Sequence, residues 1–344
     1  MAADELHPSL RVPAREVPVP ATVSAEAQAF LAAGVVHPFA QWPAPDDHDA
    51  WASLVAEQEK MTATAEARDY LGALMAGGTD PSVRVDTETV DMDGVRVFVA
   101  TPEGTAPDDR RVYLAIHGGN FTMGGGDICR ANAAATAASL RTRVWGIDYR
   151  MPPRHPHPAP LDDCVTVYRS ALRDRAPQEI AIGGTSAGGN LTATSILRAR
   201  DEGLPLPAAA VLCTPATDLT AASDTLRTNS GVDTTLTGDL LPLYRFYAGS
   251  HDPRDPYLSP VYGDFTRGFP PTALFSGTRD VLLSDTVRLH RALRGAGVTA
   301  ELHVFEAAPH AMFFGTAPED RERSREIRHF LDRHRTGPRP DPRG

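Results

Sequence analysis

The chain has 344 residues, of which 42% are hydrophobic, and a formal net charge of −10. This length and apolar content allow a sizeable core, in one large α/β domain or in a domain with a cap. The acidic balance argues against a nucleic-acid-binding surface. Lys60 is the only lysine, so the chain has no Walker GK[ST] motif and only one candidate for Schiff-base chemistry.

The cysteines and the N-terminus indicate a reducing setting. Cys129, Cys164 and Cys213 are scattered and show no CxxC spacing, so we expect buried apolar side chains without a disulfide framework or a metal site. The acidic N-terminus lacks the apolar segment of a signal peptide, and no stretch approaches the length of a membrane span. We therefore expect a cytoplasmic protein with no membrane span.

Residues 1 to about 80 carry helical patterns and no credible strand. A Pro-rich coil up to Pro20 precedes a short helix at residues 24–31, with Ser24 in the capping position. A second helical region is predicted from about residue 46 to 74, with Trp51 on its apolar side. We interpret residues 1–80 as an N-terminal helical cap region.

From residue 81 onward the pattern alternates between strands and helices. The predicted strands are 83–91, 95–101, 111–116, 144–149, 179–183, 208–213, 273–276 and 301–305. The predicted helices include 127–140, 161–173 and 318–334. This alternation favours an α/β fold with a mostly parallel central sheet flanked by helices.

One segment interrupts the alternation. Residues 218–260 have helical character but no strand, and they follow the strand at 208–213. Ligands bind at the carboxyl edge of an open α/β sheet, so we interpret this segment as a cap insertion. The catalytic domain is then 81–217 and 261–336, and the Pro/Arg-rich residues 337–344 are predicted to be a disordered tail.

A GxSxG pentapeptide, Gly184-Thr185-Ser186-Ala187-Gly188, lies between the strand at 179–183 and a predicted helix. This strand–turn–helix context is that of a nucleophile elbow, in which a sharp turn exposes the serine oxygen. The N-terminus of the following helix favours negative charge that develops beside the serine. Ser186 is therefore the predicted nucleophile.

A serine nucleophile needs a base and an acid that orients the base. After an elbow the chain order is serine, acid, histidine. Asp280 follows the strand at 273–276, and His310 follows the strand at 301–305, so both fall at the same sheet edge as Ser186. Asp285 is a rival acid, but we expect it inside the following helix and prefer Asp280.

A second glycine motif, His117-Gly118-Gly119-Asn120, follows the strand at 111–116. Such a loop can direct successive backbone N–H groups toward one point. Together with the N–H of Ala187 these groups would form an oxyanion hole.

With these motifs the chain resembles the hormone-sensitive lipase family of α/β-hydrolases, in particular its bacterial esterases with a GTSAG elbow. The resemblance implies an N-terminal cap over the active site and carboxylesterase activity without a cofactor or metal. It implies that Ser186 is the nucleophile, His310 the general base and Asp280 the orienting acid. It also implies oxyanion donors at Gly118, Gly119 and Ala187, with Asn120 a further donor. The matching pieces, which span about residues 80 to 315, are His117-Gly118-Gly119, Asp148-Tyr149-Arg150, Pro158-Ala159, Asp162-Asp163, Gly184 to Asn190 and Asp255 to Pro260.

Two residues depart from the family pattern. Asn120 stands where a third glycine is usual, and its side chain would enter the pocket or add a hydrogen bond there. Arg154 stands where the family's DYRLAPE run has a glutamate, so an ion pair made by that glutamate would be absent or reversed. We expect a local adjustment rather than a loss of catalysis.

We therefore predict a serine carboxylesterase that hydrolyses small to medium acyl esters through an acyl-enzyme. Alternatives with the same triad are an amidase, a deacetylase or a lactonase acting on a secondary metabolite; a dehydratase has no specific support. A non-catalytic receptor is less favoured. The gibberellin receptors, which share this fold, lack the catalytic histidine, whereas this chain keeps a complete candidate triad. Candidates for an apolar pocket are Phe39, Trp42, Tyr244, Phe246 and Tyr247, although each such residue is more often ordinary packing than a ligand contact. The expected partner is a small-molecule ester, and the resemblance also implies a homodimer through an edge strand.

Overall fold

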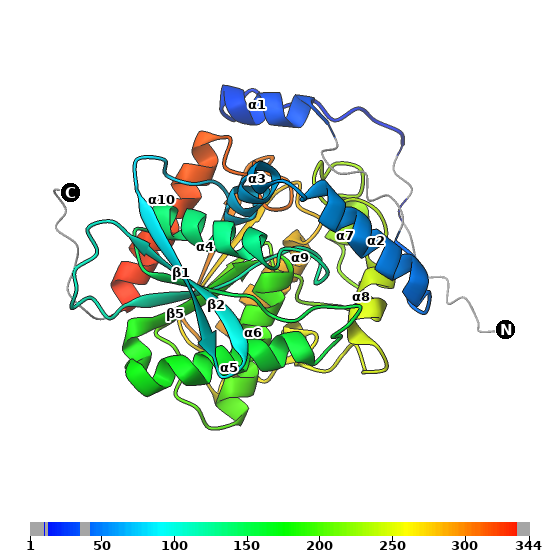
Figure 1. Ribbon diagram of the computed structural model, residues 1–344. Coiled ribbons are helices and arrows are strands. Elements are labelled where there is room, and N and C mark those ends of the chain that lie inside the picture. The colour runs from blue at the N-terminus through cyan, green and yellow to red at the C-terminus, as the bar shows by residue number, and fades with distance from the viewer. Residues whose placement is uncertain (1–9, 11–12, 35–41, 336–344) are drawn as a thin grey trace.

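The computed structural model describes residue 10, residues 13–34 and residues 42–335 of the chain. Within these residues the centre is an eight-stranded sheet with strand order β1-β2-β4-β3-β5-β6-β7-β8 (Figure 1). Strands β3 to β8 pair in parallel, whereas β2 is antiparallel to both β1 and β4. The strands are β1 Val85–Met92, β2 Val95–Pro102, β3 Val112–Ile116, β4 Val144–Ile147, β5 Ile180–Thr185, β6 Ala209–Cys213, β7 Thr272–Gly277 and β8 Ala300–Phe305. The predicted α/β fold with a mostly parallel sheet is confirmed.

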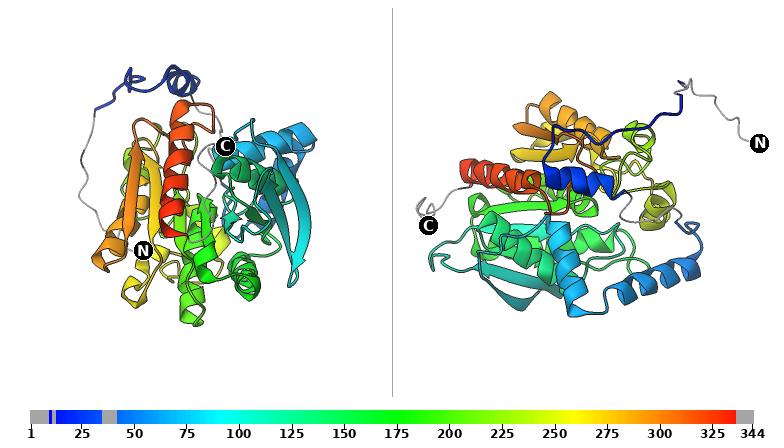
Figure 2. Two further views of the ribbon diagram at one scale, coloured as in Figure 1. Left: turned by 90° about the vertical axis from the view of Figure 1, so that its left-hand side faces the viewer. Right: turned by 90° about the horizontal axis from the view of Figure 1, so that it is seen from above.

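Helices lie on both faces of this sheet (Figure 2). The helices are α1 Ala25–Ala32, α2 His48–Met61, α3 Ala65–Ala76, α4 Asp127–Leu140, α5 Ala159–Asp174, α6 Ala187–Asp201, α7 Thr225–Thr228, α8 Leu241–Ala248, α9 Leu283–Gly295 and α10 Pro318–His334. One apolar cluster joins α4 and α10 to one face of the sheet, and a larger one joins α5, α6 and α9 to the other face. Burial of these two clusters is the main force that holds the layers together. No helix in the described part of the chain is long and apolar enough to cross a membrane.

The predicted elements agree closely with the observed ones, with one difference in the N-terminal region. The single helical region predicted at 46–74 is two helices, because the chain leaves the helix after Met61 and restarts at Ala65. The hydroxyl of Thr64 accepts the N–H of Ala67 at 3.1 Å and so caps α3. Threonines favour such caps over helix interiors, and this preference explains the break. The boundaries predicted for the cap regions stay predictions, and residues 337–344 lie outside the described residues.

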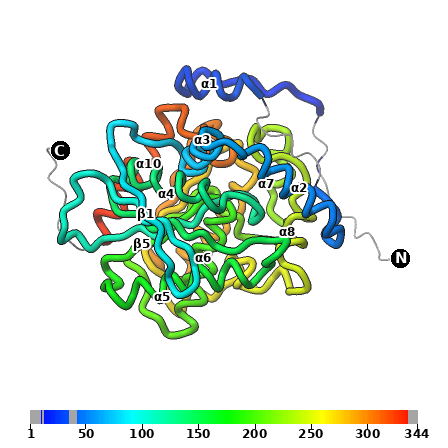
Figure 3. The backbone as a smooth tube through the Cα atoms, in the orientation of Figure 1, coloured from blue at the N-terminus to red at the C-terminus, as the bar shows by residue number. Residues whose placement is uncertain are grey.

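The N-terminal helices contact two different parts of the molecule. Helix α1 lies at one end of the molecule, apart from α2 and α3 (Figure 3). It buries Ala27 and Leu31 against the segment that follows β8, where Met312 and Phe313 complete the apolar cluster. Helix α3 instead packs on α4 so closely that a Cβ at Gly72 would lie 2.5 Å from that of Ala131.

Helix α2 is joined to the 218–260 segment by stacked aromatic rings. Trp51 is fully buried, and its ring stacks on Phe246 of α8 with 4.0 Å between ring centroids. Trp42 also stacks on Trp51, with 5.8 Å between ring centroids, and the indole N–H of Trp51 donates to the carbonyl of Ala44 at 3.0 Å. This stack connects two parts of the chain that are far apart in sequence.

We predict that Trp51→Ala lowers the free energy of unfolding by about 3–5 kcal/mol, because it removes a buried ring and leaves a cavity. The matched control is Tyr70→Ala on α3, whose side chain is 66% exposed and whose loss should cost about 0.5 kcal/mol or less. Denaturant unfolding followed by circular dichroism measures both changes. Equal losses in the two variants would contradict the role given to the stack.

Candidate active site

Ser186 stands in the sharp turn between β5 and α6. Its backbone has φ 60° and ψ −119°, a conformation that non-glycine residues rarely adopt. The turn packs tightly against the end of β3, because a Cβ at Gly184 would collide with the carbonyl of Ile116, and one at Gly188 with the same carbonyl. Only glycine fits at these two positions, and for this reason the predicted elbow geometry forms here.

The structure brings Ser186, His310 and Asp280 into one hydrogen-bonded series. His310 Nε2 lies 2.9 Å from Ser186 Oγ, and His310 Nδ1 lies 3.1 Å from Asp280 Oδ1. Asp280 also accepts a hydrogen bond from Ser276 Oγ at 2.6 Å and one from the N–H of Leu282 at 2.9 Å. A carboxylate can only accept, so Nδ1 carries the imidazole proton, and Nε2 is left to accept the serine proton.

The rival acid Asp285 lies elsewhere. It is buried in the first turn of α9, where its carboxylate accepts the N–H groups of Thr217 at 2.6 Å and Asp218 at 2.9 Å and bonds the Ser223 hydroxyl. Burial raises the pKa of Asp285 to about 7, against the effect of these hydrogen bonds. Asp285 therefore ties the segment after β6 to α9, and no hydrogen bond joins it to His310 among the described residues.

Burial and neighbouring charges act in opposite directions on His310. Its burial lowers the pKa of the imidazole, but the hydrogen bond that Nδ1 donates to Asp280 and the negative charges of Asp280 and Asp233 raise it, and the net shift is upward from 6.5. The electrostatics therefore favour a proton on the imidazole, as a base that takes the serine proton requires.

The loop after β3 faces Ser186 with glycine backbone. Among the described residues, no hydrogen bond uses the N–H of Gly118, Gly119, Asn120 or Ala187 as donor. A Cβ at Gly118 would lie 3.6 Å from that of Ser186, so this backbone runs directly beside the serine. Asn120 has φ 56°, a conformation that asparagine tolerates better than most residues. These free donors suit a developing oxyanion.

The run Asp148-Tyr149-Arg150 after β4 holds this loop. The hydroxyl of Tyr149 donates to the carbonyl of His117 at 2.9 Å, and the two rings stack with 4.1 Å between centroids. Asp148 accepts the N–H of Gly126 at 2.8 Å and pairs with Arg96. These contacts give a structural reason for a motif that carries no chemistry itself. Arg154, further along, is exposed and forms no ion pair with the described residues.

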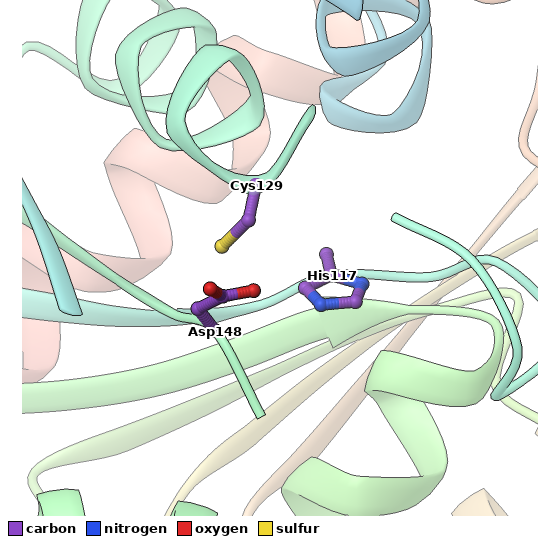
Figure 4. A group of neighbouring side chains, drawn as sticks. All are labelled: His117, Cys129 and Asp148. Atoms are coloured by element: carbon purple, nitrogen blue, oxygen red, sulfur yellow. The ribbon is translucent and has the colours of Figure 1, made fainter. Parts of the chain in front are cut away.

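His117, Cys129 and Asp148 form the group in the described residues whose donor atoms could hold a metal ion (Figure 4). These atoms lie within 4.8 Å of one another, and His117 Nε2 has no hydrogen-bond partner among the described residues. However, both oxygens of Asp148 are already engaged by Gly126 and Arg96, and burial raises the pKa of the Cys129 thiol. A thiol must ionise to bind a metal well, so we assign this group to the support of the glycine loop.

A cavity of about 280 Å³ opens on Ser186 and His310 and is also lined by Gly118, Gly119 and Asn120. Most of its remaining wall is apolar, and it comes from α2, α3, the 218–260 segment and the segment after His310. The apolar lining residues include Met61, Leu71, Leu74, Met75, Leu236 and Phe314.

The predicted pocket aromatics do not form this wall. Trp42, Tyr244, Phe246 and Tyr247 are buried in the main core cluster, and Phe39 lies outside the described residues. For these four residues the ordinary alternative holds: large aromatic side chains in a helical segment more often fill the core than line a ligand site. Much of the apolar lining instead belongs to α2, α3 and the loop around Leu236, and no motif in these stretches marks it.

Comparisons with known proteins agree with this arrangement. The sequence profile of the α/β-hydrolase fold family matches residues 113–314. An acetyl-hydrolase of Streptomyces hygroscopicus is 35% identical over 209 residues, which are 60% of this chain and 70% of that protein. The crystal structure of esterase E25 superposes with a TM-score of 0.81 at 34% identity and covers 95% of this chain and 99% of that one. An esterase from the bacterial hormone-sensitive lipase family superposes with a TM-score of 0.72 at 28% identity, over 90% of this chain and 98% of the other.

We predict that a fluorophosphonate probe labels Ser186 at a rate that falls as the pH is lowered through the raised pKa of His310. The neutral imidazole accepts the serine proton, so the labelling rate should be highest above this pKa and should lose half its value at a pH above the ordinary histidine value of 6.5. Gel fluorescence after timed labelling measures the rate. Labelling that does not vary from pH 5 to 9 would contradict the contact between His310 and Ser186.

Proposed function

The chain belongs to the hormone-sensitive-lipase group of the α/β-hydrolase fold family, and from this membership we propose that it is a serine carboxylesterase acting on small to medium acyl esters. The observation that carries the proposal is the unbroken hydrogen-bonded series from Asp280 through His310 to Ser186, at the mouth of an apolar cavity. The names of its relatives, an acetyl-hydrolase and several esterases, support ester hydrolysis as the reaction.

The proposed reaction is acyl transfer in two steps. Ser186 Oγ attacks the ester carbonyl while His310 Nε2 takes its proton, and the backbone N–H groups of Gly118, Gly119 and Ala187, with that of Asn120, stabilise the oxyanion. His310 then gives the proton to the leaving alcohol. Water repeats the sequence on the acyl-enzyme, and Asp280 holds the imidazole in one orientation throughout. No step requires a cofactor.

The volume and lining of the cavity favour small substrates with an apolar acyl group. Sites for small ligands commonly measure about 300–1,000 Å³, and this cavity, at about 280 Å³, lies at the low end. Its apolar wall suits an acyl chain better than a charged group. A short or medium acyl chain is therefore the substrate class that we propose.

The alternative reactions use the same residues and differ in the bond that is cleaved. Rates on a matched ester, lactone and N-acetyl amine distinguish an esterase from a lactonase or deacetylase. Turnover of any of them would argue against a receptor. The homodimer and the cytoplasmic location stay predictions.

We predict that Ser186→Ala lowers the turnover of p-nitrophenyl butyrate by roughly 10⁶-fold, because the covalent route is lost. Ser195→Ala is the matched control, since Ser195 is a buried serine of the helix that follows Ser186, and it should retain most of the activity. Spectrophotometric release of p-nitrophenol measures both. Full activity of the Ser186 variant would overturn the proposed function.

We further predict that Asp280→Asn lowers kcat by about 10⁴-fold, because the amide no longer fixes the imidazole in the reactive tautomer. Asp285→Asn should instead lower the melting temperature with a much smaller effect on kcat, because this side chain holds the segment after β6. Steady-state kinetics and thermal unfolding of the two variants test the assignment, and the opposite ranking of kcat would exchange the two acids.

A further inference from the structure

Asp233 is a buried carboxylate beside the candidate active site that the sequence motifs do not reveal. It lies in the 218–260 segment, between α7 and α8, and is fully buried. Among the described residues, no cationic side chain pairs with the Asp233 carboxylate. Its hydrogen bonds come from backbone N–H groups. A buried carboxylate without a cation is costly, and its position needs an explanation.

The backbone partners of Asp233 belong to three different loops. Oδ1 accepts the N–H of Thr235 at 2.8 Å and of Leu236 at 3.1 Å, within its own segment. Oδ2 accepts the N–H of Val281, the residue after Asp280, at 2.9 Å. The N–H of His310 itself points at both oxygens, at 3.3 and 3.2 Å. One side chain thus joins the acid loop, the base loop and a wall of the cavity.

The rest of the segment holds the same acid loop, and its helix α7 contacts α9, the helix that follows this loop. Asn229 Nδ2 donates to the carbonyls of Thr278 at 3.1 Å and Asp280 at 2.9 Å. The hydroxyl of Thr225 donates to the carbonyl of Val281 at 2.9 Å. These bonds fix the backbone on both sides of Asp280, whereas Asp233 alone reaches across to His310.

We propose that Asp233 is a positioning residue of the reaction: it holds the backbones of Val281 and His310 so that imidazole and acid meet, and it places a second negative charge beside the imidazole. The proposal rests on the proposed function, because it assigns His310 the role of base. The groups that face His310 are Asp280 in the β7–α9 loop, Asp233 in the 218–260 segment and Ser186 at the elbow.

Electrostatics agree with this geometry. Burial and the charge of Asp280 raise the pKa of Asp233, against the effects of His310 and the backbone donors. The charge of Asp233 in turn contributes to the raised pKa of His310. When the imidazole becomes positively charged during acyl transfer, the charge of Asp233 at the backbone of the same residue adds to the attraction from Asp280.

Two substitutions separate geometry from charge. Asp233→Asn keeps the size but removes the charge, and its amide N–H₂ must face backbone donors on one side. It should lower kcat by about 10²-fold, the scale of a 1 Å misplacement, with little change in KM. The acidic limb of kcat/KM should move to lower pH, because His310 loses a charge that raises its pKa.

Asp233→Glu keeps the charge but adds a methylene group, so it displaces the two loops. Its kcat should also fall, but the midpoint of its acidic limb should stay near that of the wild type. The matched control is Asp320→Asn, whose carboxylate is equally buried and accepts the N–H groups of Phe313 and Ala317. That variant should lose stability without a shift of the pH midpoint.

Rates are normalised to active sites counted by fluorophosphonate labelling, so a partly folded variant still reports its kcat. The labelling rate of Ser186 against pH is measured in parallel, and it tests Asp233 even if the ester is not a substrate. A wild type that turns over no ester contradicts the proposed function, not this inference. Wild-type kcat and pH midpoint in Asp233→Asn would overturn the inference. Failure of both Asp233 variants to fold would also overturn it, because Asp233 would then determine the fold rather than the active-site geometry.

Discussion

The arrangement depends on one constraint: side chains from the ends of β5, β7 and β8 must meet within hydrogen-bond distance. Ser186 is fixed by the elbow itself, since a tight turn between a strand and a helix leaves it one conformation. Asp280 and His310 have no such support, because they lie in loops outside regular structure. Fixing the backbone of one loop residue costs about 1–2 kcal/mol of conformational entropy. The loops therefore need partners elsewhere in the chain.

Those partners come from distant segments. The 218–260 segment binds the Asp280 loop through Thr225, Asn229 and Asp233. The N-terminal segment contacts both loops, because Arg279 donates to the carbonyl of Pro18 at 2.7 Å and Thr22 donates to Glu306 at 2.8 Å. Helix α1 adds an apolar contact to the segment that follows His310. The segments that we interpret as cap thus also brace the loops they lie beside.

The features predictable from sequence are those with a local cause. The strands predicted from apolar runs, the elbow predicted from its glycines and the helices predicted at 127–140 and 318–334 all lie where we expected them. Proximity of Ser186, Asp280 and His310 also follows from local patterns, because parallel strands end at one sheet edge. The placement of α1 depends on the long-range contacts of Ala27 and Leu31, and no pattern within residues 24–31 specifies that partner. Asp233 carries no signal either, because its partners are backbone N–H groups, which every sequence offers.

The position of Asp233 has an energetic consequence for the proposed reaction. In the resting state Asp233 is a buried carboxylate near Asp280, and burial, followed by the charge of Asp280, raises its pKa. Its backbone hydrogen bonds offset part of the cost. Once His310 takes the serine proton, the charge of Asp233, held at the backbone N–H of His310, attracts the positively charged imidazole. An interaction that is stronger in the transition state than in the ground state lowers the barrier, whereas one that is equal in both does not. A carboxylate whose burial is unfavourable in the resting enzyme can therefore still lower the barrier of the reaction at the neighbouring histidine.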